Sequence, residues 1–293
     1  MTAHTEKLYG KYLRECERVS LPGMSREEFD AAIQVRLADM ETLWTDGGAV
    51  YYRLWEEGGQ RHCAVPVYGY WAVSEKALSR LFTALAEKTA QKTTVYHICL
   101  YAHDTEAQRL FSMLQFGTVA EKGIMRIGDA PPGGPFAVKT LSKSEIAEDW
   151  DGLWDMTHAI VRHLQLSPVF YPGREFTEDV YREFYLDEDT HLHAVCTPEG
   201  ERIGLIESNE EDCWFTGSAT AANVGEAYVL PPYRGSGAAQ SLLSHAAAWE
   251  KERGAEYLWV EHGTANPLAR GFWGKYFKTF QYEMTREICV EIE

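Results

Sequence analysis

Hydrophobic and polar positions follow two different periods along the 293-residue chain. Apolar residues three and four positions apart predict helices at 7–18, 25–45, 74–92, 104–114, 143–164, 177–186, 237–253 and 266–276. Alternating segments rich in aromatic and β-branched residues predict strands at 50–55, 63–73, 95–101, 191–197, 203–208, 225–230, 257–262 and 283–293. Ser25 followed by Glu28 predicts a capping box at the start of the second helix. Interleaved helices and strands predict an α/β protein.

One short segment interrupts this pattern. Residues 128–135 contain three prolines and three glycines, which neither a helix nor a central strand accommodates. We interpret 128–135 as a linker between a domain at 1–127 and a domain at 136–293. Each part is long enough to bury a hydrophobic core of its own.

The two parts share an internal similarity. Residues 77–127 align with residues 238–288 without a gap, at a constant offset of 161. Both segments read helix, strand, helix, strand, which favours an ancient duplication over chance matching of apolar residues. The aligned pairs include Leu81 with Leu242, Tyr96 with Tyr257, Arg109 with Arg270, Phe111 with Phe272, and Phe116 with Phe277.

Composition narrows the function classes. A formal net charge of −16 argues against nucleic acid or an anionic membrane as the main partner, since both attract basic surfaces. No apolar run is long enough to span a bilayer, and no secretory signal opens the chain. Six scattered cysteines form no C-x-x-C pair and have no metal-ligand spacing with histidine. We therefore expect a cytoplasmic protein that holds no metal.

The strongest chemical signal lies at 229–239, where a predicted strand runs through Pro231 and Pro232 into a glycine-containing loop and then a helix. Gly235 and Gly237 lack a Cβ, so the backbone can lie close to a ligand. The first N–H groups of the helix, with Arg234, would attract a pyrophosphate. The segment lacks the third glycine of a dinucleotide-binding fingerprint and the Gly-Lys-Ser/Thr of a P-loop.

This segment resembles the acyl-coenzyme A signature of the GNAT acetyltransferase superfamily, V-x-P-x-x-R-G-x-G-x-A/G. Two further stretches, 200–204 and 266–277, are similar to the turn before that signature and to the family's N-x-x-A helix. The resemblance covers nearly all of 136–293. Every position of the signature is filled, by Val229, Pro231, Arg234, Gly235, Gly237 and Ala239.

The resemblance implies tandem GNAT-like α/β domains, each a mixed, mostly antiparallel sheet flanked by helices. It implies acyl transfer from acyl-CoA, with acetyl-CoA the first candidate donor, to an amine. The strand before the loop would part from its neighbour and hold the pantetheine arm. The residues expected to bind the cofactor are Tyr228, Val229, Leu230, Arg234, Gly235, Ser236, Gly237, Ala238, Ala239 and Asn266.

The amine must lose a proton and the leaving thiolate must gain one. Glu226, three residues before Val229, lies where the family often places its general base; the alternatives are that it is a solvated strand residue or that it faces away from the acceptor. Trp273 stands where many family members have an acidic tyrosine, so Tyr276 is the candidate general acid, with core packing as the alternative. His158, His163 and His262 read as packed or surface imidazoles, and Phe170 and Tyr171 as candidate walls of the acceptor pocket.

In the N-terminal half, the offset places 73–76 where the phosphate loop lies, without its glycines and with an acidic Glu75. We expect a degenerate GNAT-like domain without an acyl-CoA site; a helical-plus-β domain of separate origin is the alternative. The leading function is N-acyl transfer to a small-molecule or peptide amine. The alternatives are a non-catalytic acyl-CoA sensor or scaffold and, more remotely, an O-acyltransferase. The sequence is compatible with a homodimer and does not identify the acceptor.

Overall fold

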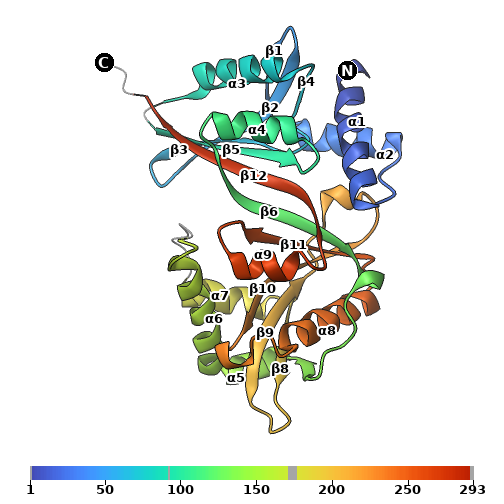
Figure 1. The fold of residues 1–293 in the computed structure, drawn as a ribbon, viewed down its shortest axis with the longest axis vertical. Helices are drawn as coiled ribbons and strands as arrows, with labels where there is room; N and C mark the ends of the chain where they lie inside the picture. The colour runs from blue at the N-terminus through green and yellow to red at the C-terminus, as the bar shows by residue number, and fades with distance from the viewer. Residues whose placement is uncertain (1, 92, 171–176, 291–293) are drawn as a thin grey trace. The chain divides into compact units, whose positions relative to one another are not determined.

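A computed structural model describes residues 2–91, 93–170 and 177–290 of the chain. The chain forms two compact units (Figure 1). Unit 1 comprises 1–122 and 279–293, and unit 2 comprises 123–278.

Unit 1 is a mixed α/β unit. Its sheet has the strand order β1-β2-β3-β5-β12-β6, and β4 pairs with β2 at the side. Strands β3 and β5 are parallel, whereas β1–β2, β2–β3 and β5–β12 are antiparallel. The elements are α1 (Thr2–Val19), α2 (Arg26–Leu37), β1 (Glu41–Thr45), β2 (Gly48–Glu57), β3 (Gln60–Val65), β4 (Tyr70–Ala72), α3 (Glu75–Thr89), β5 (Thr93–Tyr101), α4 (Thr105–Met113), β6 (Gly117–Arg126) and β12 (Lys278–Cys289).

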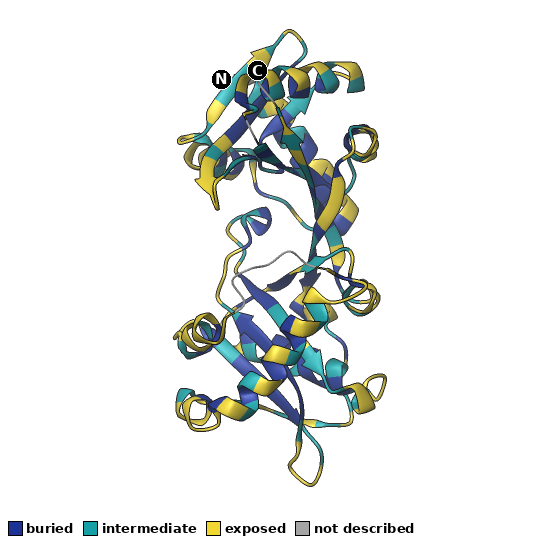
Figure 2. Cartoon of the chain, turned by 90° about the vertical axis from the view of Figure 1, so that its left-hand side faces the viewer, coloured by how far each residue is buried: buried dark blue, intermediate teal, exposed yellow. Residues whose placement is uncertain are grey.

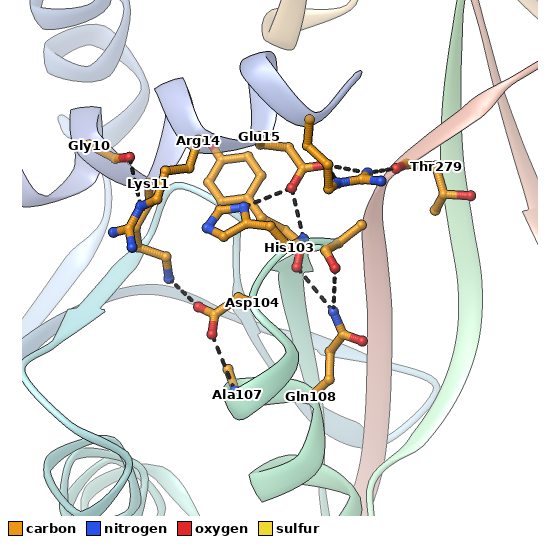
Figure 3. Close-up of polar contacts among 12 residues, drawn as sticks. Gly10, Lys11, Arg14, Glu15, His103, Asp104, Ala107, Gln108 and Thr279 are labelled. Atoms are coloured by element: carbon orange, nitrogen blue, oxygen red, sulfur yellow. Dashed lines mark hydrogen bonds and ion pairs between the residues drawn. The ribbon is translucent and has the colours of Figure 1, made fainter. Parts of the chain in front are cut away.

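Two acidic side chains, the buried Glu15 and the half-buried Asp104, hold α1 against the turn between β5 and α4 (Figure 3). Glu15 is fully buried and accepts the backbone N–H of His103 at 2.8 Å, with His103 Nδ1 2.7 Å from the same oxygen. Asp104 Oδ2 lies 2.9 Å from Lys11 Nζ, and Asp104 Oδ1 caps α4 by accepting the N–H of Ala107. The core of unit 1 forms where α3 and α4 pack on β2, β3 and β5.

Unit 2 has the strand order β11-β10-β9-β8-β7, with the end of β6 beside β11. Strands β10 and β11 are parallel and the pairs from β10 to β7 are antiparallel. Its elements are β7 (Ala137–Thr140), α5 (Lys143–Glu148), α6 (Trp150–Gln165), α7 (Glu178–Leu186), β8 (Thr190–Cys196), β9 (Arg202–Asn209), β10 (Ala221–Val229), α8 (Ala238–Glu252), β11 (Tyr257–Gly263) and α9 (Pro267–Trp273).

Helices cover both faces of the sheet in unit 2. Apolar residues of α8 pack with Ile203 and Ile206 in one core, while α5, α6 and α7 pack with Leu192 and Leu205 in another. Figure 2 shows buried strands between helices whose outer faces are exposed. The expected mixed, mostly antiparallel sheet flanked by helices is therefore confirmed in each unit.

The predicted repeat is visible in the order of the elements. Strand β6 begins at Gly117 and β12 at Lys278, which is the predicted offset of 161, and α3-β5-α4-β6 matches α8-β11-α9-β12 throughout. The final strands, however, cross between the units. Strand β12 pairs with β5 from Gln281 to Cys289 in unit 1. Strand β6, by contrast, leaves unit 1 after Lys122, and its end lies beside β11.

The compact units consequently divide the chain elsewhere than at the predicted linker. Residues 128–135 lie inside unit 2, where Gln240 Nε2 donates to the carbonyl of Pro132 at 2.9 Å. Residues from 279 onward, assigned to the second domain by sequence, belong to unit 1. Proline and glycine exclude regular structure from 128–135 but do not prevent the segment from packing on α8.

Two predicted helices are shorter than expected. Helix α2 ends at Leu37, and residues 41–45 form β1 instead, paired with β2 across the Asp46-Gly47 turn. The predicted helix at 143–164 is divided at Asp149 into α5 and α6. The capping box of Ser25 and Glu28 is confirmed.

Candidate active site

Strands β10 and β11 separate in the middle of unit 2. They pair in parallel only from Ala221↔Tyr257 to Asn223↔Trp259. Beyond that point β10 pairs only with β9, and a bulge between Val224 and Ala227 shifts the register. A bulge bends and twists its strand. The remainder of β10 therefore diverges from β11 and leaves an opening between two parallel strands.

The loop after β10 leads directly to the N-terminus of α8. Pro231–Tyr233 form a single 3₁₀ turn, and Arg234 Nε donates to the carbonyl of Val229 at 3.1 Å. Gly237 precedes α8 with φ +96°, a conformation that L side chains rarely adopt. Because Gly237 has no side chain to cap the helix, the first N–H groups of α8 are left for a ligand.

A cleft of about 570 Å³ joins the strand opening to this loop. Among the expected cofactor-binding residues, those that line it are Tyr228, Val229, Arg234, Gly235, Gly237, Ala239 and Asn266. The other three, Leu230, Ser236 and Ala238, do not line it. Leu230 packs against both cores of unit 2, Ala238 is 1% exposed, and the Ser236 hydroxyl donates to the carbonyl of Tyr233.

Helix α9 supplies the opposite wall. Asn266 caps it, accepting the N–H groups of Leu268 at 3.2 Å and Ala269 at 3.3 Å. Tyr276 also lines the cleft, with its ring 5.4 Å from that of Phe272. Trp273, at the position of the family's tyrosine, is 5% exposed and packs in the core next to α8. Tyr276 thus contacts Phe272 and also lines the cleft, so both interpretations made from the sequence, general acid and core packing, stay open.

Glu226 lies in the bulge of β10 and faces two tyrosines of α7. The hydroxyl of Tyr181 donates to Glu226 Oε1, and that of Tyr185 donates to Oε2 at 3.2 Å. Burial raises the pKa of Glu226 to about 7, although the two hydroxyl bonds act in the opposite direction. A carboxyl that titrates near neutral pH is suited to remove a proton from an amine. Glu226 itself is not among the residues lining the cleft, whereas its neighbour Ala227 is.

Sequence reasoning missed a second carboxyl beside Glu226. Glu207 of β9 is 1% exposed and its Oε2 accepts the backbone N–H of Glu226 at 3.3 Å. Asn209 Nδ2 donates to its other oxygen at 2.7 Å. Burial and then repulsion from Glu226 raise the pKa of Glu207 to about 8. The available signal was a glutamate directly after the apolar stretch Ile203–Ile206 of a predicted strand, because a charged residue is seldom fully buried unless it is paired.

Comparison with known proteins identifies this part of the chain. The model of the acetyltransferase (GNAT) family matches residues 158–277, which contain the bulge, the loop, α8 and α9. Residues 158–277 form a GNAT acetyltransferase domain. No curated protein matches the chain in sequence.

Solved structures extend the likeness beyond the GNAT domain. A GCN5-related N-acetyltransferase from Sphaerobacter thermophilus is 15% identical, with a TM-score of 0.58, over 98% of this chain and 93% of that one. It shares the fold of nearly the whole chain. A GCN5-related N-acetyltransferase from Kribbella flavida (12% identity, 88% and 94% covered, TM-score 0.47) and a tandem GNAT protein from the clavulanic acid biosynthesis pathway (13%, 98% and 96%, 0.47) are more distant in structure.

Metal ligands, membrane-spanning helices and cysteines are the other features of the described chain that bear on its chemistry. Within 2–91, 93–170 and 177–290, no three or more histidine, cysteine or acidic side chains gather as metal ligands would. Over the same ranges, no helix has the length and apolar character needed to cross a bilayer. None of the six cysteines, all within these ranges, forms a disulfide. Phe170 is exposed, and Tyr171 lies outside the described residues.

Proposed function

We propose that the GNAT domain transfers an acyl group, acetyl in the first instance, from acyl-CoA to the nitrogen of an amine acceptor. One observation carries the proposal: the cleft where β10 leaves β11 continues to the uncapped N-terminus of α8. The strand edge offers backbone groups to the pantetheine arm, and the helix N-terminus offers N–H groups to the pyrophosphate. A non-catalytic acyl-CoA sensor would use the same cleft without turnover.

The phosphate end of the proposed cofactor site is formed by Arg234 to Ala239. Gly235 (φ +79°) and Gly237 (φ +96°) line the cleft in a backbone conformation that glycine adopts readily, and neither has a Cβ to keep a ligand at a distance. Tyr228, Val229 and Leu230 would run along the pantetheine, and Asn266 would face it from α9. Fixed N–H dipoles near the thioester oxygen would stabilise the charge that develops there.

Glu226 is the proposed general base. Its carboxyl is half-buried and accepts hydrogen bonds from two tyrosine hydroxyls, and its pKa is raised to about 7, so it is suited to take the proton of an attacking amine. The chain is acidic overall, which weakly favours a cationic acceptor, either a small molecule or a peptide amine. Tyr276 stays the proton donor expected from the sequence, to be compared with another candidate below.

Acetyl-CoA titration by calorimetry and a panel of amines with detection of released thiol test the proposal together. We expect one bound acetyl-CoA and thiol release that depends on the amine. Glu226→Gln should lower kcat by about 100-fold or more and leave acetyl-CoA affinity unchanged. Glu199→Gln, at an exposed turn, is the matched control. Binding without release for any amine would favour the sensor, and absence of binding would refute both functions.

Unit 1 is proposed to bind no acyl-CoA. Strands β3 and β5 are paired at five positions, from Arg61↔Thr94 to Val65↔Ile98. The corresponding strands of unit 2, β10 and β11, are paired at only three positions before they separate, so unit 1 has no comparable opening at this position. Ser74 Oγ caps α3 by accepting the N–H of Ala77 at 3.2 Å, where Gly237 leaves α8 uncapped. Two acetyl-CoA molecules bound per chain would contradict this assignment.

We also propose a cytoplasmic setting, in keeping with six free cysteines, and a site that requires no metal. Turnover should therefore be unchanged by a chelator. Whether the chain forms a homodimer is to be tested by sedimentation.

A further inference from the structure

One histidine that lines the cleft has a ring nitrogen without a hydrogen-bond partner among the described groups. His163 lies near the end of α6 and lines the cleft together with Ala227 and Tyr228. Its Nε2 atom is buried, and no described group lies within hydrogen-bonding distance of it. A buried polar atom without a partner costs free energy unless a ligand or water satisfies it. Of the side-chain atoms in this condition within the described part of the chain, that of His163 is the one that belongs to the cleft.

Contacts along α6 show which end of the cleft His163 occupies. At the start of α6, Asp149 Oδ2 accepts from Arg202 at 2.5 Å, and β9 begins at Arg202 beside the end of β10. Further along, Thr157 Oγ1 lies 3.2 Å from Tyr185 Oη, which donates to Glu226. Helix α6 thus runs from the loop end of the cleft toward Glu226.

His163 follows Thr157 by six residues, about 9 Å along the helix axis. It therefore lies beyond the level of Thr157, at the end of the cleft farther from the loop at 234–237. We call this the reacting end, because the proposed base Glu226 lies on the same side. The other titratable or charged side chains lining the cleft are Tyr228, Tyr233, Arg234, Lys275 and Tyr276.

The reaction needs a proton for the leaving sulfur, and most candidates at this end are already committed. Tyr181 and Tyr185 donate their hydroxyl protons to Glu226, and Trp273 carries no acidic group. Imidazole is the side chain that exchanges protons near neutral pH. On the basis of the proposed acyl transfer, we propose that His163 is a catalytic residue that donates the Nε2 proton to the departing CoA sulfur.

The step balances as follows. The amine nitrogen attacks the thioester carbonyl carbon, and its proton passes to the Glu226 carboxylate. As the C–N bond forms, the C–S bond breaks and its electron pair stays on sulfur. The His163 imidazolium gives its Nε2 proton to that sulfur, so the products are the amide and CoA thiol. Glu226 then returns its proton to solvent, and neutral His163 takes one from solvent.

The test compares His163→Gln with His158→Gln in the full chain. His158 is an exposed histidine on the same helix, stacked on Trp154, and serves as the control. His163→Gln should lower kcat by about 100-fold with acetyl-CoA affinity within about twofold of wild type, the range expected for loss of a general acid. It should also abolish the fall in kcat at high pH that marks loss of the donated proton. Imidazole in solution should restore turnover to His163→Gly.

Each outcome of this comparison either supports or overturns the proposed role of His163. A kcat for His163→Gln within about twofold of wild type would overturn the proposal. So would a fall at high pH that persists in His163→Gln but disappears in Tyr276→Phe. If His163→Gln folds poorly, judged by circular dichroism, His163→Asn and the imidazole rescue replace it. A wild-type protein that binds acetyl-CoA but releases no thiol with any amine would refute the proposed function itself, a result distinct from equal turnover of wild type and variant.

Discussion

The carboxyl pair of β9 and β10 gives a quantitative prediction through Glu207→Gln. Glutamine keeps the size of the side chain and an oxygen to accept the N–H of Glu226, but it cannot ionise. In the folded protein the pKa of Glu207 rises from an ordinary value of 4.5 to about 8. At about 1.4 kcal/mol for each pH unit between the two values, the full effect is about 5 kcal/mol. Part of the rise in the pKa comes from repulsion by Glu226, which local movement and water weaken. We therefore expect an effect on the free energy of unfolding of about 3 kcal/mol.

The direction follows from proton binding. The folded protein holds the Glu207 proton more tightly than the unfolded chain does, so this side chain destabilises the fold progressively as pH rises from 4.5 to 8. The free energy of unfolding of Glu207→Gln minus that of wild type should therefore increase by about 3 kcal/mol from pH 5 to pH 8. Urea unfolding at several pH values measures it, with Glu199→Gln as control. A difference that does not change with pH would refute the assignment of a buried, protonated Glu207.

Three further predictions concern the cleft and its supports. Gly237→Ala should weaken acetyl-CoA binding about tenfold in calorimetry, because φ +96° costs an L residue about 1–2 kcal/mol; Gly117→Ala, in open space, should have no effect. Tyr181→Phe removes a hydrogen bond that lowers the pKa of Glu226, so the rise of kcat with pH should move to higher pH; an unmoved profile contradicts this. Asn266→Ala uncaps α9 and should cost about 1 kcal/mol in urea unfolding.

Local signals in the sequence were enough for much of the fold. The Ser25 cap and the helix that follows Gly237 depend on residues close to one another in the chain, and each is present. The order of elements at a spacing of 161 is likewise carried by local periodicity. Where a local pattern was ambiguous, pairing with a distant strand decided: residues 41–45 have a helical spacing but pair with β2.

The candidate site divides in the same way. Its cofactor half is one continuous stretch, so the loop and the start of α8 could be located from residue types alone. Its reacting half is assembled from separate elements: Glu207 meets Glu226 across β9 and β10, and Tyr181 and Tyr185 reach Glu226 from α7. The register of a sheet and the packing of a helix bring such groups together, and neither is encoded in the spacing of residues.

By itself, then, the sequence determined the α/β class, the repeated order of elements and the glycine-containing loop that precedes α8, because these rest on interactions between near neighbours. Only the tertiary structure decided that β6 continues from unit 1 into unit 2 while β12 pairs with β5, that Glu207 meets Glu226 across β9 and β10, and that His163 lines the cleft. These depend on pairing and burial between residues far apart in the chain, where the free energy of a contact depends on everything else around it.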